Sequence, residues 1–170
     1  MILIAAADLN NGIGFKNRLL YDIPEDKKFF KEKTIGGAVV MGRKTYESLP
    51  VKPLPKRQNI IMTRNNDTVY EDAVSVHSTE ELLKYISDLP EDKVFVIGGA
   101  EIYSKLLPFC STAYITRIYD TRSADRFIPD FDILEGWQPV EKSEIKEYNG
   151  IRYQFIKYSK KITLDNWKMM

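Results

Sequence analysis

The sequence predicts an α/β fold with a doubly wound, mostly parallel central sheet, an antiparallel hairpin at its C-terminal edge, and helices on both faces. Apolar runs of strand length alternate with helical signals as far as about residue 118. These runs are almost wholly apolar, which is typical of parallel strands buried on both faces. Beyond them, apolar and polar residues alternate around Asn149-Gly150, a strong hairpin signal.

The composition indicates one ordinary globular domain. The chain has 170 residues, 44% of them hydrophobic, with 25 Lys and Arg against 24 Asp and Glu. We expect one domain over residues 1–160 and a short C-terminal extension over residues 161–170. The formal charge of +1 favours neither nucleic acid nor a membrane surface as a partner. One cysteine and one histidine exclude a disulfide framework and a His/Cys metal cluster, so we expect a reduced, metal-free, cytoplasmic protein. We also expect a monomer.

The expected strands are short apolar runs bounded by Gly, Pro, Asn or charged residues. They cover residues 1–7, 38–41, 59–63, 73–76, 94–97 and 113–118, with an antiparallel pair at residues 137–140 and 151–158. The first run is too short, and too poor in basic residues, for a signal peptide or a membrane span. A capping box at residues 78–81 opens a helix through Ile86, and another helix spans residues 100–107.

The first expected helix carries an acid on its apolar face. It begins at Pro24, which suits a first turn, and runs toward Thr34. Residues three and four apart share a helix face, so Asp26 points the same way as Phe29 and Phe30. Burying an unpaired carboxylate costs several kcal/mol, which indicates a partner group, a bound proton or a ligand cleft. The alternative is an acid at a solvated edge that only complements the helix dipole.

A phosphate site is indicated after the strand at residues 38–41. Gly42 stands at the strand-to-helix turn, and Arg43, Lys44 and Thr45 follow it. Free N–H groups, the helix dipole and the two cations all favour an anion there, which points to a nucleotide phosphate. A tight turn with solvated basic residues fits the same pattern.

Two glycine-containing segments complete the candidate site. The strand at residues 94–97 runs into Gly98 and Gly99, where the absence of side chains lets the backbone approach a dinucleotide. A plain turn is the alternative. A long polar, glycine-rich segment lies between the first strand and Pro24, and it suits either a lid or a surface loop. Its residues of note are Ala6, Asp8, Asn10, Asn11, Gly12 and Gly14.

In this order and spacing, the candidate segments resemble dihydrofolate reductase. The resemblance covers residues 2–160 and rests on IAAADLNNGIGFKNRLLYDIPEDKKFFKEKT, VVMGRKTYESL, PLPKRQNIIMTR, VFVIGGAEIY and YITRI. It implies NADPH-dependent reduction of dihydrofolate to tetrahydrofolate, by hydride transfer with protonation of the pterin ring. This reaction supports one-carbon metabolism and thymidylate synthesis. The resemblance also implies antifolates as inhibitors.

The resemblance places the substrate around Asp26. In the family, an acid on the first helix binds the amino group and the adjacent ring nitrogen of the pterin, and Asp26 matches that acid. The resemblance assigns catalytic positions to Asp26, Tyr21 and Thr116, with Thr116 supporting Asp26. Arg57 matches the arginine that binds the glutamate α-carboxylate. The full substrate-binding set is Ile4, Ala5, Asp26, Phe30, Leu49, Arg57, Ile97 and Thr116.

The resemblance also implies a cofactor site for NADPH and no metal. The paired glycines pass beneath the nicotinamide and pyrophosphate, and Lys44 and Thr45 hold the pyrophosphate. The residues that match the surroundings of the 2′-phosphate are Arg43, Thr63, Arg64 and His77. The full cofactor-binding set is Ala6, Ile13, Gly14, Gly42, Arg43, Lys44, Thr45, Thr63, Arg64, His77, Gly98, Gly99, Ala100, Glu101, Ile102 and Tyr103.

The sequence departs from the family pattern near both expected ligands. Tyr21 replaces a tryptophan beside an active-site water, and its hydroxyl is expected to hold that water or to reach the pterin carbonyl. Leu20 replaces a common proline, and Lys27 follows Asp26 where apolar residues are common. Glu101 stands where a basic residue near the cofactor phosphates is frequent.

Two other functions fit parts of the pattern. A related class of the same fold reduces a ribosylated pyrimidine in flavin biosynthesis, whereas Asp26 and Arg57 suit a pterin and a glutamate tail. A non-catalytic nucleotide-binding protein of this fold would have no need for those two residues together.

Overall fold

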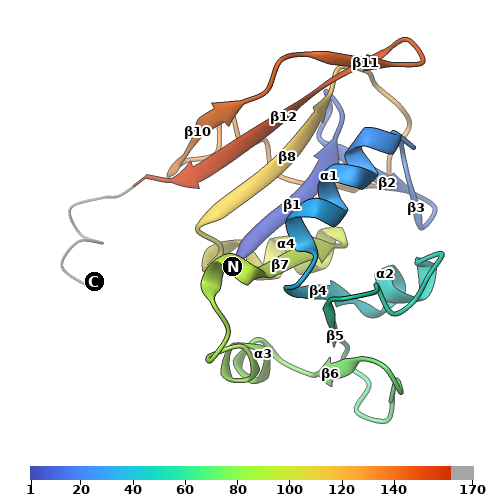
Figure 1. Ribbon diagram of the computed structural model, residues 1–170, viewed down its shortest axis with the longest axis vertical. Helices are drawn as coiled ribbons and strands as arrows, with labels where there is room; N and C mark the ends of the chain where they lie inside the picture. The colour runs from blue at the N-terminus through green and yellow to red at the C-terminus, as the bar shows by residue number, and fades with distance from the viewer. Residues whose placement is uncertain (162–170) are drawn as a thin grey trace.

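The computed structural model describes residues 1–161, which form a large sheet and a small one (Figure 1). The helices are α1 (Pro24–Thr34), α2 (Arg43–Ser48), α3 (Thr79–Tyr85) and α4 (Ala100–Leu106), with short 3₁₀ turns at Glu91–Lys93 and Leu107–Phe109. The strands of the large sheet are β1 (Ile2–Ala7), β4 (Ala38–Gly42), β5 (Gln58–Met62), β6 (Val74–Val76), β7 (Val94–Gly98), β8 (Thr112–Ile118), β10 (Trp137–Lys142), β11 (Lys146–Tyr148) and β12 (Ile151–Lys160).

The large sheet is parallel except at its C-terminal edge. Its order is β10-β12-β8-β1-β7-β4-β5-β6, with β11 paired to β12. All neighbours from β8 to β6 pair in parallel, whereas β12 runs antiparallel to β8, and β10 antiparallel to β12. Figure 1 shows this antiparallel edge at one end of the sheet and β6 at the other. The predicted sheet arrangement is therefore confirmed.

A hydrophobic core lies on each face of this sheet, because successive side chains of a strand point to opposite sides. Leu3 and Val40 belong to the core that includes side chains of α3 and α4. Their neighbours Ile4 and Val39 belong to the core against which α1 and α2 pack. The helices therefore cover both faces, as the sequence predicts.

Residues 8–14, expected as a loop, are partly a strand. The segments β2 (Gly12–Phe15), β3 (Arg18–Leu19) and β9 (Arg126–Phe127) pair as a small sheet in the order β3-β2-β9. The strands are too short to show a periodicity, and β9 comes from a distant part of the chain. Local pattern alone therefore does not reveal this sheet.

The predicted hairpin turn is present, but an unpredicted strand precedes it. Asn149 and Gly150 have φ of 49° and 78°, the left-handed conformations that a tight hairpin turn requires. The turn joins β11 to β12. The expected strand at residues 137–140 is β10, which pairs with the far part of β12, with a register shift between Pro139 and Glu141.

The helix signals in the sequence match the structure closely. The capping box is present, since the Ser78 hydroxyl accepts a hydrogen bond from the Glu81 backbone N–H at 3.0 Å. The Glu81 carboxylate in turn accepts one from the His77 backbone N–H at 2.7 Å. Helix α2 begins at Arg43, directly after Gly42, so the basic residues lie in its first turn.

Within residues 1–161, no helix has the length and apolar character needed to cross a membrane. The same residues contain no group of three or more His, Cys, Asp or Glu side chains placed to hold a metal ion. The expected extension at residues 161–170 lies outside the described residues, except for Lys161.

Candidate active site

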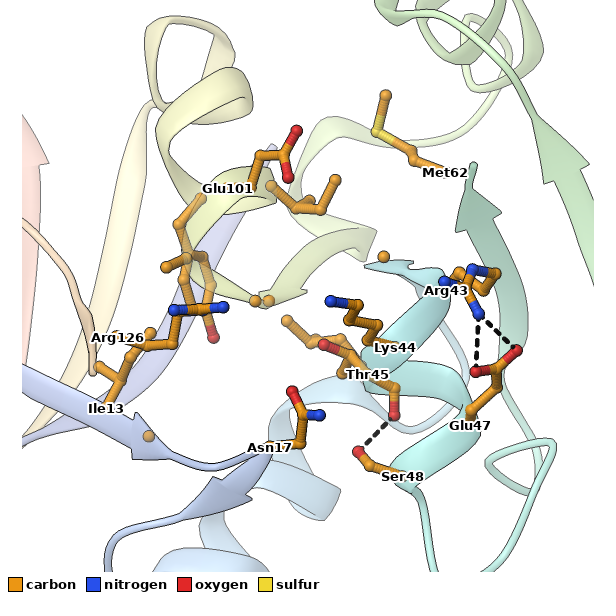
Figure 2. A pocket seen from close by; sticks show the side chains of 18 of the residues that line it. Ile13, Asn17, Arg43, Lys44, Thr45, Glu47, Ser48, Met62, Glu101 and Arg126 are labelled. Atoms are coloured by element: carbon orange, nitrogen blue, oxygen red, sulfur yellow. Dashed lines mark hydrogen bonds and ion pairs between the residues drawn. The ribbon is translucent and has the colours of Figure 1, made fainter. Parts of the chain in front are cut away.

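A cavity of about 690 Å³ lies at the carboxyl ends of the parallel strands (Figure 2). Its walls come from the ends of β4, β5 and β7, the first turns of α2 and α4, and the small sheet. In parallel α/β sheets, ligands bind at this edge. All the residues that the sequence assigns to the cofactor line the cavity: Ala6, Ile13, Gly14, Gly42, Arg43, Lys44, Thr45, Thr63, Arg64, His77, Gly98, Gly99, Ala100, Glu101, Ile102 and Tyr103.

The paired glycines form the turn between β7 and α4 at the cavity wall. Gly98 has φ of +118°, a conformation that residues with a side chain rarely adopt. A Cβ at Gly98 would lie 3.3 Å from the ring of Tyr103. The Tyr103 hydroxyl donates a 2.7 Å hydrogen bond to the backbone carbonyl of Ile4, which ties α4 to β1. Backbone, rather than side chains, therefore forms this part of the wall.

Cationic side chains enter the cavity from two sides. Figure 2 shows Lys44, in the first turn of α2, and Arg126, on β9, pointing into it from opposite directions. Arg43 is turned toward Glu47, with Nη1 to Oε2 at 3.0 Å. The positive charges and the free N–H groups at the start of α2 make the cavity suitable for an anion.

A second set of polar side chains lies where β5 and β6 end. It comprises Arg64, Thr63 and His77, which line one end of the cavity. The His77 ring nitrogen Nδ1 lies 2.9 Å from the backbone carbonyl of Thr63, so this contact fixes the ring. Arg64 is paired with Glu101 across the rim, with Nη2 to Oε1 at 2.6 Å.

Asp26 lies in the first turn of α1, beside β8. Its Oδ1 accepts a 2.6 Å hydrogen bond from the Thr116 hydroxyl, the contact that the sequence analysis expects. Burial raises the pKa of Asp26, and the hydrogen bond from Thr116 acts in the opposite direction with a smaller effect. The pKa of Tyr103 is also raised, first by burial and then by the nearby charge of Asp26.

Most of the apolar residues that the resemblance assigns to the substrate share one cluster, and with Asp26 we call them the Asp26 surface. Ile4, Phe30, Leu49 and Ile97 belong to or pack against one hydrophobic cluster. Ile97 also lines the cavity, so the two regions meet there. Ala5 packs against the core on the opposite face instead.

Arg57 lies near the far end of this apolar surface. Its guanidinium carbon is 5.9 Å from the centre of the Phe30 ring. Nη1 donates to the Thr34 hydroxyl at 3.1 Å, and Nε donates to the Pro55 carbonyl at 2.9 Å. Burial lowers the pKa of Arg57. These contacts hold the guanidinium in one orientation at the protein surface.

The hydroxyl of Tyr21 faces protein carboxylates. It lies 3.5 Å from Oδ2 of Asp8, and the guanidinium of Arg122 lies 4.2 Å from the ring centre. Burial raises the pKa of Tyr21, and the charges of Asp120 and Asp8 add to this effect. The body of the ring packs against the cluster that contains Ile23.

The cavity also includes residues that the sequence analysis does not assign to a site. They are Phe15, Asn17, Arg18, Leu19, Glu47, Ser48, Met62, Asn65, Thr68, Lys105 and Arg126. Lys105 lies one turn beyond Glu101 on the same helix, so helix periodicity gives a signal for it. Residues of the small sheet reach the cavity through long-range pairing, for which the sequence has no local signal.

Comparisons with known proteins identify the family of the chain. The family model for dihydrofolate reductase matches residues 1–160. Dihydrofolate reductase of Bacillus subtilis (strain 168) is 39% identical over 160 residues, covering 93% of each chain. The enzyme of Neisseria gonorrhoeae is 39% identical over 157 residues, covering 92% of this chain and 95% of the relative.

A solved structure matches the whole fold. It is dihydrofolate reductase from Enterococcus faecalis, complexed with NADP(H) and RAB-propyl. Its TM-score is 0.84 at 35% sequence identity, and the match covers 95% of this chain and 96% of that one. The family model, the relatives and the fold together show that the chain belongs to the dihydrofolate reductase family.

Proposed function

We propose that the chain reduces dihydrofolate to tetrahydrofolate by holding NADPH in the cavity and dihydrofolate against the Asp26 surface, with the two ligands meeting at Ile97. The product serves one-carbon metabolism and thymidylate synthesis. The family match supports the NADPH-dependent activity. One observation supports this assignment of the two ligands: the partly buried carboxylate of Asp26, hydrogen-bonded to Thr116, lies beside a cavity with a glycine wall and cationic rims.

The cavity residues fit NADPH. Lys44 and Arg126 supply charge from opposite sides for the pyrophosphate, and Gly98 leaves room for a flat ring against the backbone. Arg64 and His77 are the groups we assign to the 2′-phosphate. When bound, NADPH supplies the hydride.

Asp26 binds and orients the substrate ring in this proposal. A carboxylate at the edge of an apolar surface accepts two parallel hydrogen bonds from the amino group and adjacent N–H of a flat heterocycle. Thr116 fixes the carboxylate through its 2.6 Å hydrogen bond. Ile4 and Phe30 exclude water from the ring. Because burial raises the pKa of Asp26, this carboxyl holds a proton near the ring at a higher pH than an exposed aspartate.

We assign Arg57 to the carboxylate at the other end of the substrate. Contacts with Thr34 and Pro55 use one N–H of Nη1 and the N–H of Nε, which leaves both N–H groups of Nη2 and one of Nη1 to donate to that carboxylate. A guanidinium that is already held in place loses little side-chain entropy on binding.

Arg57→Met tests this assignment. The Michaelis constant for dihydrofolate is expected to rise by about 10- to 100-fold, because a charged hydrogen bond is worth about 1.5–3 kcal/mol. The constant for dihydropteroate, which lacks the glutamate, should change by less than about twofold. Lys84→Met, which removes a cation from α3, is the control for general charge effects. Equal rises for both substrates in steady-state assays would place Arg57 away from the glutamate.

Tyr21→Phe tests whether the hydroxyl takes part in the chemistry. The sequence analysis expects that hydroxyl near the pterin, but its contact is with Asp8. We therefore expect turnover to fall by no more than about twofold, and the free energy of unfolding to fall by about 0.5–1.5 kcal/mol. Tyr119→Phe, which removes an exposed hydroxyl bonded to Gln154, is the matched control. A tenfold loss of turnover at unchanged stability would assign the Tyr21 hydroxyl to proton delivery.

The remaining proposals concern partners. The Enterococcus faecalis relative was solved with RAB-propyl beside NADP(H), which supports small-molecule inhibitors at the same site here. We assign antifolates to the Asp26 surface, whose carboxylate suits any flat ring with paired N–H donors. The formal charge of +1 offers no net attraction to nucleic acid or to an anionic membrane, so we assign neither as a partner. A monomeric state and a cytoplasmic location complete the proposal.

A further inference from the structure

Arg64, the cation that we assign to the 2′-phosphate, already forms an ion pair with the carboxylate of Glu101. Arg64 follows β5 and Glu101 lies in the first turn of α4, so their ion pair joins two sides of the cavity rim. Nη2 of Arg64 lies 2.6 Å from Oε1 of Glu101. Figure 2 shows Glu101 at the edge of the cavity.

This ion pair is not part of the structural core. The two side chains are 86% and 70% exposed, so the pair contributes little to folding stability. An exposed pair can also exchange partners readily, because water solvates both groups when they separate. The pair can instead affect ligand binding, since both side chains line the cavity.

A phosphate dianion at this end of the cavity meets two opposing effects. Arg64 attracts it, whereas Glu101 repels it and occupies a nitrogen of Arg64. Arg43 has a carboxylate partner as well, at 3.0 Å. The phosphate therefore has to displace Glu101 before Arg64 can bind it with its full set of donors.

A ribose 2′-hydroxyl meets no such conflict. A carboxylate accepts a hydrogen bond from that hydroxyl, as an acidic residue does in dinucleotide sites that bind NADH. Glu101 can therefore favour the unphosphorylated ribose while it weakens binding of the phosphorylated one.

We infer that Glu101 limits the preference of this enzyme for NADPH over NADH by holding Arg64 in an ion pair that the 2′-phosphate must break. The inference rests on the proposed placement of NADPH in the cavity. It makes Glu101 a specificity-determining residue that acts through Arg64.

The test compares ligands that differ by one phosphate. Dissociation constants for 2′,5′-ADP and 5′-AMP are measured by calorimetry in the wild type, Glu101→Gln, Arg64→Ala and the double variant. We expect Glu101→Gln to tighten binding of 2′,5′-ADP about tenfold, which corresponds to 1.4 kcal/mol, and to leave 5′-AMP unchanged or slightly weaker. Arg64→Ala should weaken 2′,5′-ADP about tenfold without affecting 5′-AMP.

The double variant shows whether Glu101 acts through Arg64. In the Arg64→Ala background, Glu101→Gln should improve binding of 2′,5′-ADP by less than about threefold. The matched control is Glu141→Gln on β10, whose side chain is 72% exposed and paired with Lys157 at 3.6 Å. It should change neither constant.

Three results would overturn the inference: no change beyond twofold for 2′,5′-ADP in Glu101→Gln, equal changes for both ligands, or a full tenfold gain that persists without Arg64. The ratio of kcat/KM for NADPH over NADH should follow the binding data. Because the binding test needs no dihydrofolate, it can succeed or fail independently of the proposed reaction. A chain that binds 2′,5′-ADP as expected but does not reduce dihydrofolate would contradict only the proposed function.

Discussion

Asp26→Asn is expected to lower turnover with dihydrofolate by about 100-fold or more at neutral pH, while the dissociation constant for NADPH stays within about twofold. Loss of a charged hydrogen bond costs about 1.5–3 kcal/mol, and loss of proton-transfer assistance adds about 100-fold. The amide oxygen of asparagine still accepts a hydrogen bond from Thr116, so the fold should be retained. Steady-state turnover and fluorescence titration with NADPH measure the two effects. Wild-type turnover at neutral pH would remove Asp26 from the reaction.

The pH profile of the same variant gives a further check. Burial raises the pKa of Asp26, so the carboxyl is protonated below that pKa and loses its proton as the pH rises through it. Wild-type turnover that depends on this proton should therefore fall across that pKa. In Asp26→Asn the titrating group is absent, and residual turnover should rise steadily as the pH falls, because solvent then protonates the substrate. Parallel profiles for the two proteins would contradict this role.

Gly98→Ala is expected to weaken NADPH binding by about tenfold or more and to lower the free energy of unfolding by about 1–3 kcal/mol. The backbone at Gly98 has φ of +118°, and a Cβ would lie 3.3 Å from the ring of Tyr103. The turn must then shift, and it forms the wall of the cavity. Denaturant unfolding and NADPH titration measure both effects.

Gly136→Ala is the matched control for backbone strain. Gly136 has φ of +82°, and nothing lies within 4 Å of the Cβ position. This variant should lose stability through the backbone alone and bind NADPH as the wild type does. If Gly98→Ala bound NADPH equally well, the turn after β7 would not be a cofactor contact.

The sequence predicts the main sheet because its signals are local. Strand-length apolar runs such as residues 38–41 and 94–97 are visible in the sequence, and a parallel sheet buries both faces of such strands. The small sheet of β2, β3 and β9 is not predictable in this way, since pairing of Gly12 with Phe127 depends on the tertiary fold. Strand β11 was missed because it is short and mostly exposed.

The cofactor cavity was easier to predict than its charge pairs. Gly42 to Thr45 and Gly98 to Tyr103 are contiguous motifs at strand ends, so the resemblance identifies them as blocks. Partners such as Glu101 for Arg64 join separate blocks, and the motif of neither block contains that information. The same is true of Tyr21, whose contact with Asp8 depends on how two loops pack.

The central claim is tested most directly by mixing the wild-type protein with NADPH and dihydrofolate and following the loss of nicotinamide absorbance. We predict that one NADPH is oxidised for each dihydrofolate consumed, that tetrahydrofolate is the product, and that no oxidation occurs without dihydrofolate. A constant absorbance with dihydrofolate would contradict this account. Oxidation seen only with a ribosylated pyrimidine would contradict it too, and would assign the site to the related reductase class instead.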